Sequence, residues 1–190
     1  MSKLSGALLA GAMALTTVGC IGDAEVVAPD ARDALFDLGA FVDYQDSLLA
    51  DVGMRKTVRV GETEEERVIE EVDWATELAP FAGANVNKPA LTDAYAREVT
   101  EAVRGYYILL TALDSSARVR SIRIVCAGAP EATGCPYDRV ASVEVDTRFE
   151  SVIADTEQRL HWTPTGYTVV NRQRVVGREE RVLSIRGERL

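Results

Sequence analysis

The sequence predicts an α+β fold in which an N-terminal amphipathic helix and a short second helix pack on a curved antiparallel β-sheet. Apolar residues recur at three- and four-residue spacing over residues 30–52, which is typical of a helix with one buried face. From residue 95 onward, runs of six to ten residues alternate with short turns, which indicates an antiparallel meander. No long helical pattern separates these runs, so parallel βαβ units are not expected. Such a sheet could curl into a half-barrel.

The first helix is expected to span residues 30–52. Asp30 follows Pro29 and is a suitable N-cap, and Gly53 ends the run. The stripe is too short to demand a partner helix, so we expect this helix to lie against the sheet. Its apolar positions are Ala31, Leu35, Leu38, Val42, Leu49 and Val52.

The second segment combines a β-hairpin with a short helix. Residues 57–60 and 67–69 frame an acidic tip that contains Gly61, so the tip is expected in solvent rather than around a cation. Asp73 is a suitable cap for the short helix, which we expect to stop near Ala79 because Pro80 follows. Trp74, Leu78 and Phe81 share its apolar face.

About seven strands are expected to follow, with residues 147–156 irregular between two of them. Gly, Pro, Ser and Asp mark the intervening turns. The strands are expected at residues 94–103, 106–113, 118–125, 139–146, 157–162, 167–176 and 181–186.

The N-terminus has the order of a bacterial lipoprotein signal: a positive charge, an apolar stretch, a small residue and a cysteine. We expect residues 1–19 to be a signal peptide, Cys20 to carry lipid, residues 20–29 to be a tether and residues 30–190 to form one domain. An ordinary signal peptide cut after a small residue such as Gly19, or an uncleaved anchor, are the alternatives. Ile21 after the cysteine favours the outer membrane by resemblance to proteobacterial sorting rules.

The remaining cysteines, Cys126 and Cys135, bracket a loop rich in Gly, Ala and Pro. In an oxidising compartment such a pair is expected to form a disulfide, with a stabilisation of roughly 2–3 kcal/mol for so short a loop. Metal binding by the two thiols is the weaker alternative, since no histidine lies nearby in the sequence.

The chain is acidic, with a net charge of −9. This charge becomes −10 when residues 1–19, whose only charged side chain is Lys3, are removed. This charge argues against nucleic acid as a partner and against electrostatic adhesion to anionic lipid. The membrane is therefore expected as a partner through the N-terminal lipid alone. No sequence motif calls for a cofactor or a metal.

Residues 73–95 resemble a family of uncharacterised lipoproteins common in the Bacteroidota. The pattern W-x-x-E-L-x-x-F is followed by N-x-N-K-P-A-L-x-x-x-Y. The resemblance extends to the lipobox, an initial helix and a "KTV.V" strand, and it implies a compartment and a topology but no chemistry. The residues that carry it are Trp74, Glu77, Leu78, Phe81, Asn85, Asn87, Lys88, Pro89, Ala90, Leu91 and Tyr95.

Candidate ligand-binding residues lie in the run 166–176. On a strand, Tyr167, Asn171 and Gln173 share one face and could line a polar cavity. Arg172 and Arg174 share the other face and could bind a carboxylate, a phosphate or an acidic glycan. Alternatively, the arginines pair with acidic groups of a neighbouring strand and the amides satisfy edge backbone groups.

The single histidine, His161, is not accompanied by a G-x-S-x-G motif, so no catalytic residue is assigned. We expect a membrane-tethered, non-enzymatic envelope lipoprotein, facing the periplasm or the cell surface, that binds a lipid or another small apolar ligand between helix and sheet. The alternative is a structural or interaction module that docks a protein partner at the envelope, and a hydrolase acting through His161 ranks below both.

Overall fold

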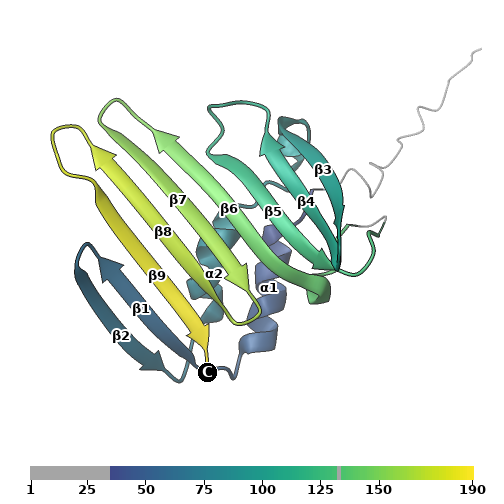
Figure 1. Ribbon diagram of the computed structural model, residues 1–190, viewed down its shortest axis with the longest axis horizontal. Coiled ribbons are helices and arrows are strands. Elements are labelled where there is room, and N and C mark those ends of the chain that lie inside the picture. Colours follow the sequence, from purple (N-terminus) through teal and green to yellow (C-terminus); the bar gives the residue numbers. More distant parts are fainter. Residues whose placement is uncertain (1–34, 132–133) are drawn as a thin grey trace, which may run out of the picture.

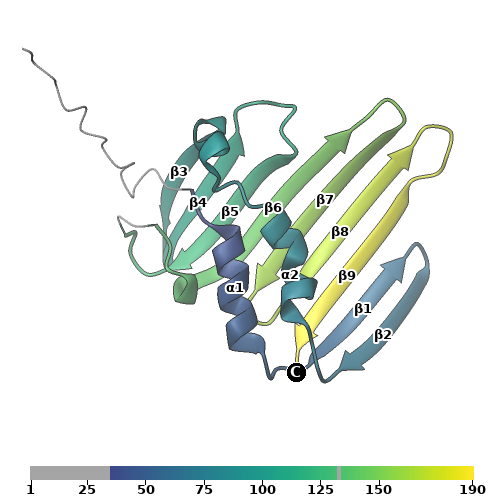
Figure 2. The same ribbon diagram turned by 180° about the vertical axis from the view of Figure 1, so that it is seen from behind.

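The computed structural model describes residues 35–131 and 134–190, which form an open nine-stranded sheet with two α-helices on one face (Figures 1 and 2). The strand order is β2-β1-β9-β8-β7-β6-β5-β4-β3, and every neighbouring pair is antiparallel. The expected α+β class is thus confirmed, and the sheet does not close. The expected signal peptide, the expected lipid attachment at Cys20 and the expected tether lie outside the described residues. The elements are α1 (Leu38–Leu49), β1 (Met54–Val60), β2 (Thr63–Ile69), α2 (Trp74–Gly83), β3 (Tyr95–Ala102), β4 (Gly105–Ala112), β5 (Val119–Ala127), β6 (Val140–Glu150), β7 (Ala154–Thr163), β8 (Gly166–Val175) and β9 (Arg181–Arg189), with 3-10 turns at Pro89–Ala94 and Tyr137–Arg139.

Helix α1 begins at Leu38, and the expected start at Asp30 and end at residue 52 were wrong. Asp37 is the N-cap, and its carboxylate accepts the Ala40 amide at 3.0 Å. Asn85 accepts the amide of Leu38 at 3.3 Å. Two helix N–H groups without a backbone partner thus find side-chain acceptors, one on Asp37 and one on Asn85, which favours a helix start at Leu38. Leu35 and Phe36 continue the apolar spacing because they pack into the core without being helical.

Helix α2 begins after its expected cap, Asp73, but it runs to Gly83 and not to the neighbourhood of Ala79. Pro80 lies inside the helix and removes one backbone donor. Phe81, in the turn after the proline, is 1% exposed. We attribute the continuation to the burial of this ring, which favours one more helical turn despite the lost hydrogen bond.

The expected hairpin and the seven-strand meander are both confirmed, with one extension. Strands β6 and β7 continue through residues that were expected to be irregular, because their register runs unbroken from Thr147–Gln158 to Glu150–Asp155. The hairpin β1–β2 does not join β3, the next strand along the chain. It pairs instead with β9, so that Lys56 lies opposite Gly187 and the last strand of the chain is internal.

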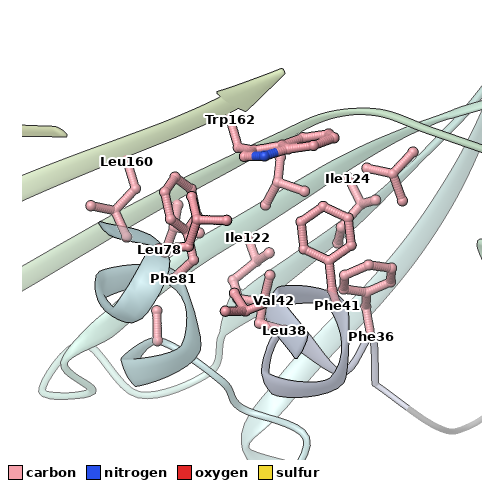
Figure 3. Packing of buried hydrophobic residues seen from close by; sticks show 14 of the residues in the cluster. Phe36, Leu38, Phe41, Val42, Leu78, Phe81, Ile122, Ile124, Leu160 and Trp162 are labelled. Carbon is pink, nitrogen blue, oxygen red and sulfur yellow. The ribbon is translucent and has the colours of Figure 1, made fainter. Parts of the chain in front are cut away.

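Side chains fill the middle of the interface between the helices and the sheet (Figure 3). The Phe41 ring meets Trp162 edge-on with their centroids 4.9 Å apart. Trp74 of α2 donates from Nε1 to the backbone oxygen of Val52 at 2.9 Å. Complete burial of each large apolar side chain contributes roughly 1.5–3 kcal/mol. Among the described residues, this packing occupies the middle of the interface, and a cleft lies at its margin. The side chains at 1% exposure or less include Leu38, Phe41, Leu49, Met54, Trp74, Leu78, Phe81, Leu110, Ile122, Ile124 and Leu160.

Cys126 and Cys135 form the expected disulfide, with their Cα atoms 6.0 Å apart. It joins the end of β5 to the segment before β6, and both residues are buried. Among the described helices, none has the length and apolarity needed to cross a bilayer.

Candidate functional site

A polar junction ties helix α2 to the sheet. The hydroxyl of Tyr167 on β8 donates to Glu77 of α2, and Lys56 of β1 donates to both oxygens of the same carboxylate at 2.7 Å. Burial, followed by the hydrogen bond to Glu77 and its charge, raises the pKa of Tyr167 far above its ordinary value, so the phenol stays protonated. Gly187 lies between Lys56 and Tyr167 in the sheet. A Cβ there would come within 2.4 Å of the Tyr167 ring, which therefore requires glycine beneath it.

A second polar cluster holds the start of α1. Asn85 and Asn87 donate from their side-chain amides to the two oxygens of Asp37, at 2.8 Å and 3.1 Å. Burial alone would raise the pKa of Asp37. The hydrogen bonds from the Ala40 amide and from the two asparagines outweigh burial and hold this pKa below its ordinary value. The N-x-N spacing seen in the sequence thus serves to orient the N-cap of α1.

Beside this cluster, a cleft of about 420 Å³ opens at the margin of the helix–sheet interface. Its walls come from the segment before α1, from β3 and β4, and from the chain around the disulfide. The Phe36 and Tyr137 rings meet edge-on with centroids 5.6 Å apart. Burial, and then the nearby Asp37 carboxylate, raises the pKa of Tyr137. The walls of the cleft are mixed in character, because the polar residues Asp37, Asn87 and Arg97 line it beside an apolar group. The apolar group is Leu35, Phe36, Ile108, Cys135, Pro136 and Tyr137.

Arg97 supplies the positive charge of the cleft. It lies on β3 opposite Leu110, whose side chain is fully buried, so Arg97 belongs to the helix-covered face of the sheet. Within residues 35–131 and 134–190 its guanidinium forms no ion pair, and the carboxylate in the lining, Asp37, is already engaged by three donors. An arginine in a cleft that also presents aromatic and aliphatic side chains is suited to hold the anionic end of an amphipathic molecule.

The candidate residues of β8 fall on two faces, as strand alternation predicts. Tyr167 is 4% exposed beneath α2, with its hydroxyl engaged by Glu77. Asn171 and Gln173 continue the same face beyond the helices, and Asn171 lies opposite Leu183. The structure therefore does not bring the Tyr167 hydroxyl together with these two amides.

The two arginines lie on the opposite, uncovered face and have different surroundings. Arg174 pairs at 3.1 Å with Glu180, which lies in the turn just before β9 and not on the neighbouring strand itself. Arg172 forms no ion pair in the described part of the chain, and it lines a depression with Arg120, Arg148 and Arg159.

His161 also lies on the uncovered face, with 45% of its side chain exposed and Glu144 4.0 Å from its Nε2. In the part of the chain that the structure describes, no serine hydrogen-bonds to it. The same residues contain no group of three histidine, cysteine, aspartate or glutamate side chains placed to hold a metal ion.

Comparison of the chain with family models, with curated proteins and with solved structures found no match. The sequence carried signals for two of the features found here. Glu77 stands out in W-x-x-E and the asparagines in N-x-N, although neither pattern names its partner. Arg97 and Arg120 have no local signal, because their importance comes from strand pairing across the sheet.

Proposed function

We propose that this chain is a non-enzymatic, lipid-anchored binding protein of the cell envelope whose ligand is a small amphipathic anion, such as a fatty acid. The anchor rests on the order of charge, apolar stretch, small residue and cysteine that ends at Cys20. The ligand rests on one observation, the presence of Arg97 beside Phe36, Ile108 and Tyr137 in the walls of a cleft of about 420 Å³.

A half-barrel carrier would hold its ligand in the middle of the helix–sheet interface, whereas the cleft of this protein lies at one end of that interface. The middle of the helix–sheet interface is filled by Phe41, Trp162 and their neighbours. The cleft lies at the end of that interface, where Leu35 and Phe36 lead into α1. An acyl chain would replace water against the rings of Phe36 and Tyr137, and each methylene removed from water contributes about 0.8 kcal/mol. The carboxylate would pair with Arg97.

Binding of a dansylated undecanoic acid to the purified mature protein tests the ligand. We expect saturable binding to the wild type and binding roughly ten times weaker or more for Arg97→Gln, because a charge-assisted hydrogen bond is lost. Arg104→Gln is the control, since Arg104 is an exposed arginine in the turn after the same strand. Equal affinity of the wild type and Arg97→Gln would contradict the proposal.

Metabolic labelling with radioactive palmitate tests the anchor separately. We expect label on the wild-type protein and none on Cys20→Ala. Label that persists in Cys20→Ala would refute lipidation at this cysteine without bearing on the cleft. Fractionation of the labelled cells then reports whether the protein resides in the outer membrane, as Ile21 favours.

A second candidate function, docking of a protein partner, is favoured by one apolar tip of the sheet. Val152 and Ile153 in the β6–β7 turn are 96% and 69% exposed, and Phe149 beside them is 59% exposed. The amide of Val176 donates to the Ile153 oxygen at 3.0 Å, which joins the next turn to this tip. The nearby Arg148 already pairs with Glu150 and Asp155, so the partner would make apolar contacts here.

A photo-crosslinking amino acid at position 152 tests this second candidate in intact cells. We expect one reproducible crosslinked protein, which is lost when Ile153 is changed to Ser. Absence of any reproducible crosslink from position 152 would count against the docking function.

A further inference from the structure

The sheet face opposite the helices carries mostly charged side chains in matched pairs. Arg159 pairs with Asp146 at 2.9 Å and Arg174 with Glu180 at 3.1 Å. Exposed pairs of this kind contribute little to stability, typically below about 1 kcal/mol each. These pairs do neutralise the charge of the face locally. An arginine without a partner on this face therefore carries a positive charge that no neighbouring carboxylate compensates.

One depression on this face, of about 280 Å³, breaks the pattern of matched charges. Four arginines from four neighbouring strands line it, against two carboxylates, Asp146 and Glu157. Among the lining residues, the arginines outnumber the carboxylates by two, and Glu150 and Asp155 beside the depression pair with Arg148. The arginines are Arg120 on β5, Arg148 on β6, Arg159 on β7 and Arg172 on β8.

Two of these arginines are held in place by neighbouring acids. Arg148 lies within 4.0 Å of three carboxylates, with its Nη2 at 3.1 Å from Asp155. Arg159 donates from Nε to Asp146, whose other oxygen accepts the Ser121 hydroxyl at 3.3 Å. The acids that line the depression are therefore already occupied by Arg148 and Arg159.

The other two arginines, Arg120 and Arg172, form no ion pair within residues 35–131 and 134–190. Arg172 lies opposite Glu157, but Glu157 points to Arg148, with 3.8 Å between Oε1 and Nη1. Arg120 lies at an irregularity of β5, where the register with β6 shifts between Val119 and Ser121. An extra residue of this kind redirects a side chain relative to the regular strand, and bulges are frequent beside binding sites.

We propose that this depression is a binding site for the phosphate group of a small molecule, with Arg120 and Arg172 as the anion-binding residues and Arg148 and Arg159 as the residues that complete the ring of positive charge. A phosphate presents three oxygens to donors from several directions, whereas one arginine can satisfy a carboxylate in a single plane. Guanidinium groups from four strands suit the first geometry. The site lies on the sheet face opposite the Arg97 cleft and does not depend on the function proposed for that cleft.

Isothermal titration calorimetry of the full mature protein with inorganic pyrophosphate, at 150 mM salt, tests the site. We expect saturable binding to the wild type and a roughly tenfold to hundredfold loss of affinity for each of Arg120→Gln and Arg172→Gln. The matched control is Arg174→Gln, which changes the next outward-facing residue of the same strand, already paired with Glu180. Its affinity for pyrophosphate should stay within about twofold of the wild type.

Two further probes identify the source of the phosphate. Glucose 6-phosphate represents a soluble phosphate ester, and dihexanoyl phosphatidic acid represents a lipid headgroup. Tighter binding of either one over the other, with the same dependence on Arg120 and Arg172, supports the site and names its source. The proposal is overturned if pyrophosphate does not bind the wild type, if both variants bind it unchanged, or if Arg174→Gln weakens binding as much as they do.

Discussion

The hydroxyl of Tyr167 on β8 donates a hydrogen bond to Glu77 of α2, ninety residues earlier in the chain. Lys56 of β1 completes the junction from a third element. This contact places α2 on the sheet and leaves the helix-side face open beyond it, where β8 and β9 continue past the helices (Figure 2). The partly buried Glu77 carboxylate, with two donors, thus adds a polar contact to the apolar packing of α2 on the sheet.

Removal of the phenol oxygen in Tyr167→Phe should lower the free energy of unfolding by about 1–2 kcal/mol, because Glu77 loses one of its two donors in a half-buried place. Denaturation in urea measures the change. Tyr107→Phe is the control, because Tyr107 lies on the uncovered face with the Arg123 guanidinium over its ring, and loss of its hydroxyl should change stability little. Equal losses for the two variants would contradict a specific role of the Tyr167 hydroxyl.

Gly187→Ala should destabilise the protein by roughly 1–3 kcal/mol through overpacking. The new Cβ would lie 2.4 Å from Tyr167 Cε1 and 2.6 Å from the Met54 sulfur. Gly83→Ala, at the end of α2, meets nothing within 4 Å and should be neutral or slightly stabilising. Thermal unfolding of both variants checks the contrast, and a Gly187→Ala protein as stable as the wild type would show that the ring does not rest on β9.

Asp37→Asn should lower stability at neutral pH by about 1–2 kcal/mol, because the amide has one acceptor oxygen where the carboxylate accepts from both Asn85 and Asn87, and because the negative charge at the helix N-terminus is lost. Hydrogen bonds hold the pKa of Asp37 in the folded protein below its ordinary value. A carboxylate whose pKa is lowered by folding contributes stability above its unfolded pKa, and this contribution disappears as the pH falls through the folded value.

The difference between the wild type and Asp37→Asn should therefore be largest near pH 7 and shrink below about pH 4. Denaturation curves at several pH values measure it. A difference that stays constant from pH 7 to pH 3 would show that the charge of Asp37 does not stabilise α1.

Replacement of Cys126 and Cys135 by Ala should cost roughly 2–3 kcal/mol of stability, as expected for a short closed loop. Because Cys135 lines the Arg97 cleft, affinity for the dansylated acid should fall together with stability. Addition of a reductant to the wild type should have the same effect and should leave the double variant unchanged. Unaltered affinity after reduction would separate the disulfide from the cleft.

Much of the fold could be predicted from local sequence patterns. Period-two alternation located the strands after residue 95, and Asp73 correctly marked the start of α2. The start of α1 could not be predicted, because Asp30 and Asp37 are equally good caps as isolated residues. Asn85 and Asn87 decide between them from about fifty residues away.

The candidate sites were harder to predict than the fold. The sequence singled out Arg172 and paired it with Arg174, its neighbour two residues later. In the structure, strand register instead places Arg172 beside arginines of β5, β6 and β7, and Arg174 forms an ion pair with Glu180. Arg97 joins Phe36 and Tyr137 only because β3 and the segment before α1 meet at one end of the interface. Such contacts depend on long-range pairing, for which one sequence carries no signal.

The central claim, an amphipathic anion in the Arg97 cleft, is tested most directly by photo-crosslinking with a fatty acid that carries a diazirine at the end of its chain. After irradiation of the purified mature protein, peptide mass spectrometry locates the labelled residues. We predict label on Phe36, Ile108 or Tyr137, reduced by excess unlabelled fatty acid and by Arg97→Gln. Label confined to the exposed tip around Phe149 and Val152, or label in the cleft that excess fatty acid does not reduce, would contradict the account.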